Sequence, residues 1–173
     1  MRRLLLLSML LSTVYSVSAA DSVITVKGQL KDNMCSVSVG SQDFTVDLQT
    51  YATSAFRSVG SSSNAVPFSI TLENCGSAAS AVKINITGTT DSTNSTLLKN
   101  TTAPGSATGI GVQILNADKV IIQPNQSSSS LSSTNLTANQ TNIISYYAQM
   151  VSTSGTVVAG TVSSTANFTL QFN

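Results

Sequence analysis

The sequence predicts an all-β fold of the sandwich type. Only 9% of the 173 residues are charged, and Ser, Thr, Asn and Gly separate short runs in which apolar and polar residues alternate. Alternation with a period of two places the apolar side chains on one face of a strand. No window keeps a sustained helical period, and many short strands at this spacing are typical of a β-sandwich.

The first twenty residues have the layout of a secretory signal peptide. Two arginines precede an apolar run from Leu4 to Leu11, and small residues stand before a cleavage point between Ala20 and Asp21. The apolar run is too short to anchor the chain permanently in a membrane. We therefore expect residues 1–20 to be removed on export, which leaves 153 of the 173 residues. This length fits one domain with a real core.

Seven segments after residue 20 alternate in the manner of strands. In chain order, their one-face sets are Ile24, Val26, Gly28 and Leu30; Phe44, Val46 and Leu48; Val66, Phe68, Ile70 and Leu72; Val82, Ile84 and Ile86; Ile110, Val112 and Ile114; Ile144, Tyr146, Ala148 and Met150; and Ala166, Phe168, Leu170 and Phe172. Turn-rich stretches separate them at 58–64, 88–94, 101–108 and 124–130. Residues 49–57 are expected to hold one short helical turn.

The two cysteines, Cys35 and Cys75, predict one disulfide. An even number of cysteines in an exported chain favours pairing in an oxidising compartment. Closing a loop of about 40 residues stabilises the fold by roughly 4 kcal/mol. The alternative, a metal or redox pair, is disfavoured because the cysteines lack C-x-x-C spacing and the chain has no histidine.

The charge distribution argues against nucleic-acid and membrane partners. Two of the eight basic residues leave with the signal peptide, so six remain against seven acidic residues and the net charge is −1. No basic cluster is present that could neutralise phosphates or bind an anionic membrane surface.

An enzymatic function is not expected. The chain has no histidine, no spare thiol and only seven acidic residues, so a nucleophile and a base are hard to pair. Asp43 and Asp47 would lie about 13 Å apart along a strand. This separation exceeds the roughly 5–9.5 Å between paired glycosidase carboxylates. We therefore predict no catalytic residue, metal, cofactor or small-molecule substrate.

The two ends of the exported chain raise a more specific possibility. Residues 21–30 alternate like a strand but precede the first cysteine, and the pattern fits either a first strand of the sandwich or an extension that pairs with another molecule. The last predicted strand runs to Phe172, the penultimate residue. An apolar strand with an open edge invites aggregation unless something covers it. A spare strand at one end and an open edge at the other could complete each other between molecules.

Motifs along the whole chain after residue 20 carry a family resemblance. They are the extension 21–30, Asp32-Asn33, Cys35-Ser36-Val37, the run 43–48, Val66-Pro67-Phe68, Cys75-Gly76, the run 80–83, Ala159-Gly160 and the run 166–172. The family's C-terminal signature is a glycine fourteenth from the end and a penultimate aromatic residue. Gly160 and Phe172 meet both conditions. The sequence thus resembles the chaperone–usher pilins, and within them most closely the minor tip-adapter subunit of type 1 fimbriae.

The resemblance implies a fold and a mode of assembly. Such pilins resemble an immunoglobulin-like sandwich that lacks its last strand and is completed in trans by a donor strand. Residues 31–173 would form the pilin domain and residues 21–30 the donor extension, with Gly28 at the family's extension glycine. A periplasmic chaperone and then a neighbouring subunit at the outer-membrane usher would fill the groove beside the last strand. The groove strand would contribute Gly160, Phe168, Leu170 and Phe172, and the Asn173 carboxylate would bind in the chaperone cleft.

Two alternatives within the family stay open. A main rod pilin shares every motif quoted above. A tip adhesin is similar to a lectin domain followed by a pilin domain, whereas this chain has the length of one domain and carries an extension. In each case the resemblance implies export through the periplasm to a cell-surface fimbria that supports adhesion.

Overall fold

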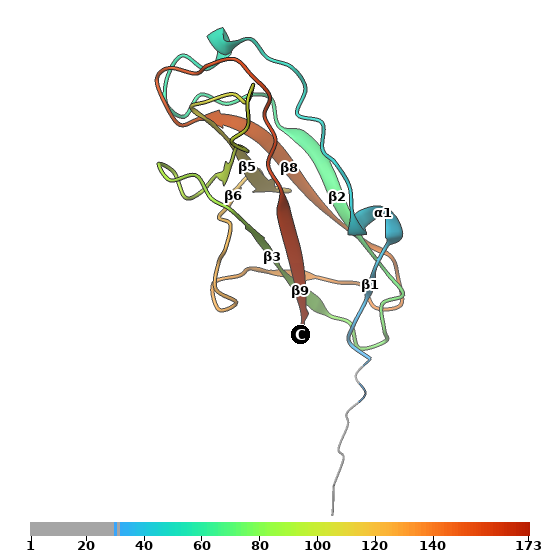
Figure 1. Cartoon of the computed structure of the whole chain (residues 1–173). Coiled ribbons are helices and arrows are strands. Elements are labelled where there is room, and N and C mark those ends of the chain that lie inside the picture. The colour runs from blue at the N-terminus through green and yellow to red at the C-terminus, as the bar shows by residue number, and fades with distance from the viewer. Residues whose placement is uncertain (1–29, 31) are drawn as a thin grey trace, which may run out of the picture. The chain divides into compact units, whose positions relative to one another are not determined.

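The computed structural model describes residue 30 and residues 32–173 (Figure 1). The chain divides into two compact units, Met1–Leu30 and Lys31–Asn173. Of the first unit only Leu30 is described, and its side chain is fully exposed. The expected signal peptide and most of the predicted strand at 24–30 therefore lie outside the described residues.

The second unit consists mainly of two antiparallel sheets. The larger sheet has the order β1-β2-β8-β5-β4, with β6 also paired to β5. Its strands are β1 (Ser36–Val37), β2 (Val66–Glu73), β4 (Leu98–Lys99), β5 (Ile110–Asn116), β6 (Ile121–Ile122) and β8 (Asn142–Ser152). The smaller sheet has the order β7-β3-β9. Its strands are β3 (Ala81–Gly88), β7 (Ser133–Asn135) and β9 (Ala166–Phe172).

Two short helical segments lie near the start of the unit. They are α1 (Val39–Gln42) and the 3₁₀ turn η1 (Thr53–Ala55). The turn η1 confirms the single helical turn predicted for residues 49–57.

The hydrophobic core lies between the two sheets. The larger sheet contributes alternating residues such as Ile70 and Leu72 on β2, and the smaller sheet contributes Val82, Ile84 and Ile86 on β3, all of them buried. The two-residue period thus predicted the buried face of these strands. This arrangement confirms the all-β sandwich.

The register of the two longest ladders fixes which side chains meet. In the larger sheet β8 is central, with Ile144 opposite Ile70 on β2. In the smaller sheet β3 pairs with β9, with Val82 opposite Phe172 and Ile84 opposite Leu170. The apolar face of β9 is therefore turned toward the core.

One predicted strand is wrong in an informative way. Val46 and Leu48 are partly buried between exposed neighbours, but no strand partner lies beside residues 44–48 in the described part of the chain. Alternation reports that one face is buried, whereas a strand also requires a neighbouring backbone. The segment therefore has the side-chain pattern of a strand but lacks the backbone hydrogen bonds to a partner strand.

Candidate functional site

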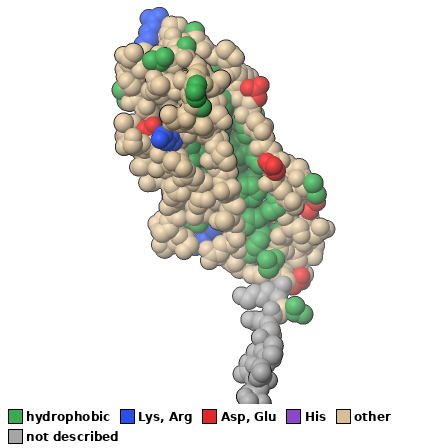
Figure 2. All heavy atoms as spheres, in the orientation of Figure 1, with side chains coloured by type: hydrophobic (Ala, Val, Ile, Leu, Met, Phe, Trp, Pro, Cys, Tyr) green, Lys and Arg blue, Asp and Glu red, His purple; other side chains and the backbone are tan. Residues whose placement is uncertain are grey.

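An open apolar groove of about 1550 Å³ runs along the second unit. One wall is formed by residues 42–53 and the other by residues 157–168, with side chains of β2, β5 and β8 between them. Figure 2 shows the groove as a continuous strip of hydrophobic side chains on the surface. An apolar strip of this kind is uncommon on a protein that acts alone and indicates a binding surface.

The first wall presents apolar side chains on an unpaired backbone. Val46 and Leu48 are partly buried against the core, and the ring of Phe44 lies 5.7 Å from that of Phe68 on β2. Within the described residues, the backbone from Phe44 to Tyr51 makes no backbone–backbone hydrogen bond. Its amide and carbonyl groups are available to another strand, apart from the Gln49 amide, which donates to the Asp47 carboxylate at 2.9 Å.

The second wall is continued by the last strand, β9. Of the described strands, only β3 pairs with β9, so the other edge of β9 has no strand beside it. Phe168, Leu170 and Phe172 are half-buried and pack against the core, and Phe168 lines the groove. The groove therefore lies between the segment 44–48 and β9, and among the described strands neither backbone has a partner on the groove side.

The predicted site residue Gly160 lies in the segment before β9 rather than on it. It lines the groove and packs against the backbone of residues 105–107, where a Cβ would come 2.5 Å from the carbonyl oxygen of Gly105. Parallel pairing of Ser106 with Thr161 holds the two segments together. Glycine is required here by a close approach of two backbones, which the sequence pattern alone did not reveal.

Sequence reasoning missed Asn100, which organises the same region. Its side chain is only 7% exposed. The amide nitrogen donates to the carbonyl oxygens of Ala107, at 2.8 Å, and Thr161, at 3.2 Å, while the amide oxygen accepts from the backbone nitrogen of Ser163, at 2.7 Å. One buried asparagine thus ties the wall segment to the loop before β5. The sequence gives little signal for this role because asparagine is common in its polar stretches.

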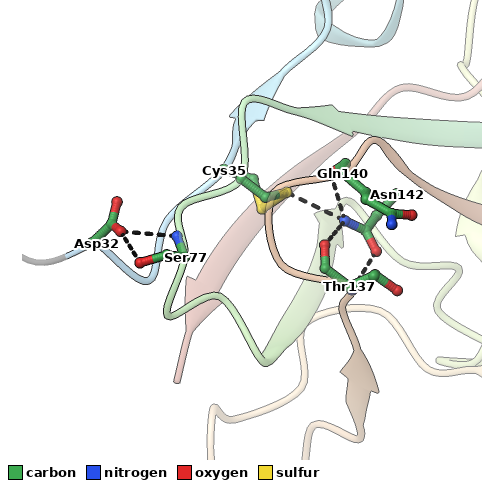
Figure 3. Close-up of a disulfide and its surroundings, with 7 residues drawn as sticks. Asp32, Cys35, Ser77, Thr137, Gln140 and Asn142 are labelled. Atoms are coloured by element: carbon green, nitrogen blue, oxygen red, sulfur yellow. Dashed lines mark hydrogen bonds between the residues drawn. A yellow bond between two sulfur atoms is a disulfide. The ribbon is translucent and has the colours of Figure 1, made fainter.

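The disulfide predicted between Cys35 and Cys75 is present and joins the segment before β1 to the loop after β2 (Figure 3). The amide nitrogen of Asn142 donates to the sulfur of Cys75 at 3.3 Å and to the carbonyl oxygens of Thr137 and Gln140. The start of β8 is thereby held against the disulfide.

A carboxylate clamp lies just before the disulfide. Asp32 accepts hydrogen bonds from the backbone nitrogen of Ser77, at 2.8 Å, and from the Ser77 hydroxyl, at 2.5 Å (Figure 3). The Ser77 hydroxyl and amide lower the pKa of the Asp32 carboxyl below its ordinary value. The carbonyl oxygen of Asp32 also accepts from the amide of Ala78. These contacts fix the first described residues of the unit to the loop after Cys75.

The remaining predicted site residues are distributed as follows. The backbone nitrogen of Asn173 donates to the carbonyl oxygen of Ala81, and its side chain donates to Ser133. Leu30 is exposed. The predicted cleavage residues Ala20 and Asp21, and the donor residues Ile24, Val26 and Gly28, lie outside the described residues.

The groove contains no metal-binding arrangement. Within residues 32–173, no three His, Cys, Asp or Glu side chains gather as metal ligands would. None of the helices in the described part is long and apolar enough to cross a membrane.

Comparisons with known proteins agree on one family. The family described as "Fimbrial protein" matches residues 24–173. The fimbrial-like protein YdeS of Escherichia coli K12 is 39% identical over 160 residues, which cover 92% of this chain and 91% of YdeS. The S-fimbrial protein subunit SfaG of E. coli O6:K15:H31 is 35% identical over 156 residues, or 90% of this chain and 86% of SfaG.

A solved structure supports the fold independently. The P pilus rod subunit PapA superposes with a TM-score of 0.68 over 80% of this chain and 99% of its own, at 24% sequence identity. At this identity the likeness concerns the fold, and it confirms the two-sheet architecture.

Proposed function

The chain belongs to the fimbrial protein family and is a subunit of a chaperone–usher pilus; from that premise we propose that it polymerises by donor-strand exchange. Its relatives and its fold are those of structural fimbrial subunits, which confirms that the chain is not an enzyme. In the proposed assembly, the groove accepts an extended segment from one neighbour, and residues 21–30 complete the groove of another.

The groove between two unpaired backbones is the observation that carries this proposal. A strand inserted there would pair with β9 on one side and with residues 44–48 on the other, up to the left-handed backbone of Gln49. Addition of an extended peptide to an open sheet edge is a known recognition mode in which backbone hydrogen bonds supply affinity and alternate side-chain pockets supply specificity. The apolar strip would receive every second side chain of the inserted strand.

The proposed donor residues have the chemistry that such a groove requires. Ile24, Val26 and Leu30 would each contribute about 1.5–3 kcal/mol on burial. Each net backbone hydrogen bond would add about 0.5–1.5 kcal/mol, while ordering each residue costs about 1–2 kcal/mol. These opposing terms are of similar size, so the durability of the joint would be kinetic, because release requires partial opening of the completed fold.

Chaperone and usher are the further partners of this proposal. Before assembly, a periplasmic chaperone would occupy the groove beside Phe168, Leu170 and Phe172 and bind the terminal carboxylate of Asn173 through basic side chains. At the outer-membrane usher, a donor extension from the next subunit would replace the chaperone strand. Export through the periplasm to the cell surface follows from the same scheme, with cleavage between Ala20 and Asp21.

Within the pilus, we propose the place of a minor adapter in the tip fibrillum, where the subunit would support adhesion. The sequence resembles the type 1 tip adapter FimF along the whole chain after residue 20. A rod pilin is the second candidate, because it would share the groove, the extension and the C-terminal signature. Counting subunits in purified pili separates the two: a few copies per fibre support the adapter, and hundreds support the rod.

Deletion of residues 21–30 tests the donor-strand proposal directly. The truncated subunit is expected to bind its chaperone but to fail to join the neighbour whose groove it would fill. Pulldown with the chaperone and immunodetection in sheared pili measure the two steps separately. Normal incorporation of the truncated subunit into pili would overturn the proposal.

A further inference from the structure

The outer rim of the groove is acidic along its first wall. Where alternate side chains of this wall turn toward the core, Asp43, Thr45 and Asp47 remain exposed on the outer face. The lining of the groove includes both aspartates but no lysine or arginine. Figure 2 shows acidic side chains beside the apolar strip. The negative charge on this rim is therefore not balanced by a basic residue of the groove.

The second wall offers no charge that could compensate. The outward-facing side chains of β9 are Asn167, Thr169 and Gln171, all exposed and uncharged. Lys83 lies opposite Gln171 but belongs to β3, which pairs with the edge of β9 that faces away from the groove. A strand inserted into the groove would thus have two aspartates along one edge and only neutral side chains along the other.

The chain itself contains a segment whose charge and length match this rim. The alternating part of the extension, residues 24–30, has seven residues, as does β9. If its apolar set enters the groove, Thr25, Lys27 and Gln29 face outward, because successive side chains of a strand point to opposite faces. Lys27 is then the charged residue in the middle of the outward face.

We infer that the acidic rim selects donor strands with a basic residue on the outward face, and that the occupant is residues 21–30 of a second copy of this chain, with Lys27 beside Asp43 and Asp47. This inference rests on the proposed function and specifies the partner that the groove prefers. It makes Asp43 and Asp47 specificity-determining residues at a site where backbone hydrogen bonds and apolar burial supply the affinity.

The match does not depend on one exact register. Side chains directly opposite each other on neighbouring strands have Cβ atoms about 4.5–5.5 Å apart, and diagonal neighbours lie about 7–8 Å apart. Lys27 opposite Asp43 or Asp47 meets a carboxylate directly. Opposite Thr45, it lies diagonal to both. Each of these registers places the ammonium group within reach of at least one aspartate.

Charge at the rim acts mainly on encounter and choice of partner. Rim charges change the association rate and its salt dependence more than they change the final affinity. Preference for its own extension would place consecutive copies of this chain next to one another in the fibre. A short run of copies in a tip and a long run in a rod both require such self-recognition.

Peptide uptake by the intact mature subunit tests this inference. The probes are fluorescent synthetic peptides of residues 21–30 with the natural sequence, with K27Q and with K27E, each added to residues 21–173. At about 20 mM salt, where screening is weak, the natural peptide is expected to enter roughly 3- to 10-fold faster than the K27E peptide, with K27Q between them. The difference should shrink strongly at about 0.5 M salt.

Charge reversal in the groove provides the decisive comparison. The D43K/D47K variant is expected to prefer the K27E peptide over the natural one. The matched control D118K changes an exposed aspartate that does not line the groove and should leave the natural preference intact. Since each result is a ratio of two peptides on the same protein, partial misfolding of a variant does not affect it. The milder variants D43N and D47N should each reduce the preference.

The outcomes separate this inference from the proposed function. Equal uptake of the natural and K27E peptides at low salt, or an unchanged preference in D43K/D47K, overturns the role of the acidic rim while leaving donor-strand exchange intact. If no donor peptide enters the groove at any salt concentration, both the inference and the proposed function fail.

Discussion

Gly160 lies directly against the backbone at Gly105, so that a Cβ at position 160 would come 2.5 Å from the Gly105 carbonyl oxygen. Gly160 lines the groove, and Gly105 lies behind it in the loop before β5. A side chain at this position would push the segment before β9 away from the loop before β5. The position thus couples the path of the chain into β9 to the loop that supports it.

Replacing this glycine is therefore expected to be costly. Gly160→Ala should lower the free energy of unfolding by about 1–3 kcal/mol, because the added methyl group cannot fit without a shift of backbone. Gly155→Ala is the matched control, since a Cβ there would meet nothing within 4 Å, and its effect should stay within about 0.5 kcal/mol. Urea unfolding followed by circular dichroism measures both. Equal midpoints for the two variants would contradict the packing described for Gly160.

Loss of the Asn100 side chain should destabilise the same region. Asn100→Ala leaves the carbonyl group of Ala107 and the amide of Ser163 without their partner, and the Thr161 carbonyl keeps only the hydrogen bond from the Ala107 amide. Unpaired buried polar groups cost about 1–3 kcal/mol each, with partial relief from water. We expect a loss of about 2–3 kcal/mol in urea unfolding. The control Asn64→Ala, at an exposed asparagine, should be near neutral. A comparable loss in that variant would contradict the stabilising role of the Asn100 hydrogen bonds.

Reduction of the Cys35–Cys75 disulfide should weaken the subunit without changing its fold class. The bridge spans 40 residues, and opening a loop of this length costs roughly 4 kcal/mol. Urea unfolding with and without a reductant should show this difference. The double variant C35A/C75A should unfold at the midpoint of the reduced protein and should not respond to reductant. A midpoint unaffected by reductant in the natural protein would show that the loop contributes little.

Acid should weaken the clamp formed by Asp32 and Ser77. The hydroxyl and amide of Ser77 lower the pKa of Asp32 in the folded state. A lowered folded pKa contributes stability above the unfolded value of about 3.9, and this contribution is lost as the pH falls below it toward the folded pKa. The melting temperature of the natural protein should therefore fall more between pH 6 and pH 3 than that of D32N. Removing the hydroxyl in S77A should reduce the same pH dependence, and parallel profiles for all three proteins would exclude the clamp.

The two-residue period of apolar side chains predicted the strands that pair with a neighbouring strand over seven residues. The segments around Ile70, Ile84, Ile114, Ile144 and Leu170 all became strands with the expected face buried, although β5 is buried on its other face as well. In these segments a two-residue period and a partner strand occur together. The short strands β1, β4, β6 and β7 were missed because two or three residues are too few to show a period.

The segment at residues 44–48 illustrates the limit of this reasoning. Its alternation was real, since Val46 and Leu48 pack against the core, but its backbone has no strand beside it in the described residues. Pairing depends on a second segment that sequence alone cannot place next to the first. The absence of that partner created the groove, which is the site of the proposed function.

The sequence by itself determined that this protein is a disulfide-closed β-sandwich with a family signature at its end, because these features depend on residue identity and local period. Only the tertiary structure decided that residues 42–53 and residues 157–168, which lead into β9, face each other across an apolar groove. It also decided that position 160 has no room for a side chain, that Asn100 joins two distant segments, and that Asp43 and Asp47 lie at the rim of the groove. These features depend on contacts between residues far apart in the chain, and those contacts exist only when the whole sandwich has formed.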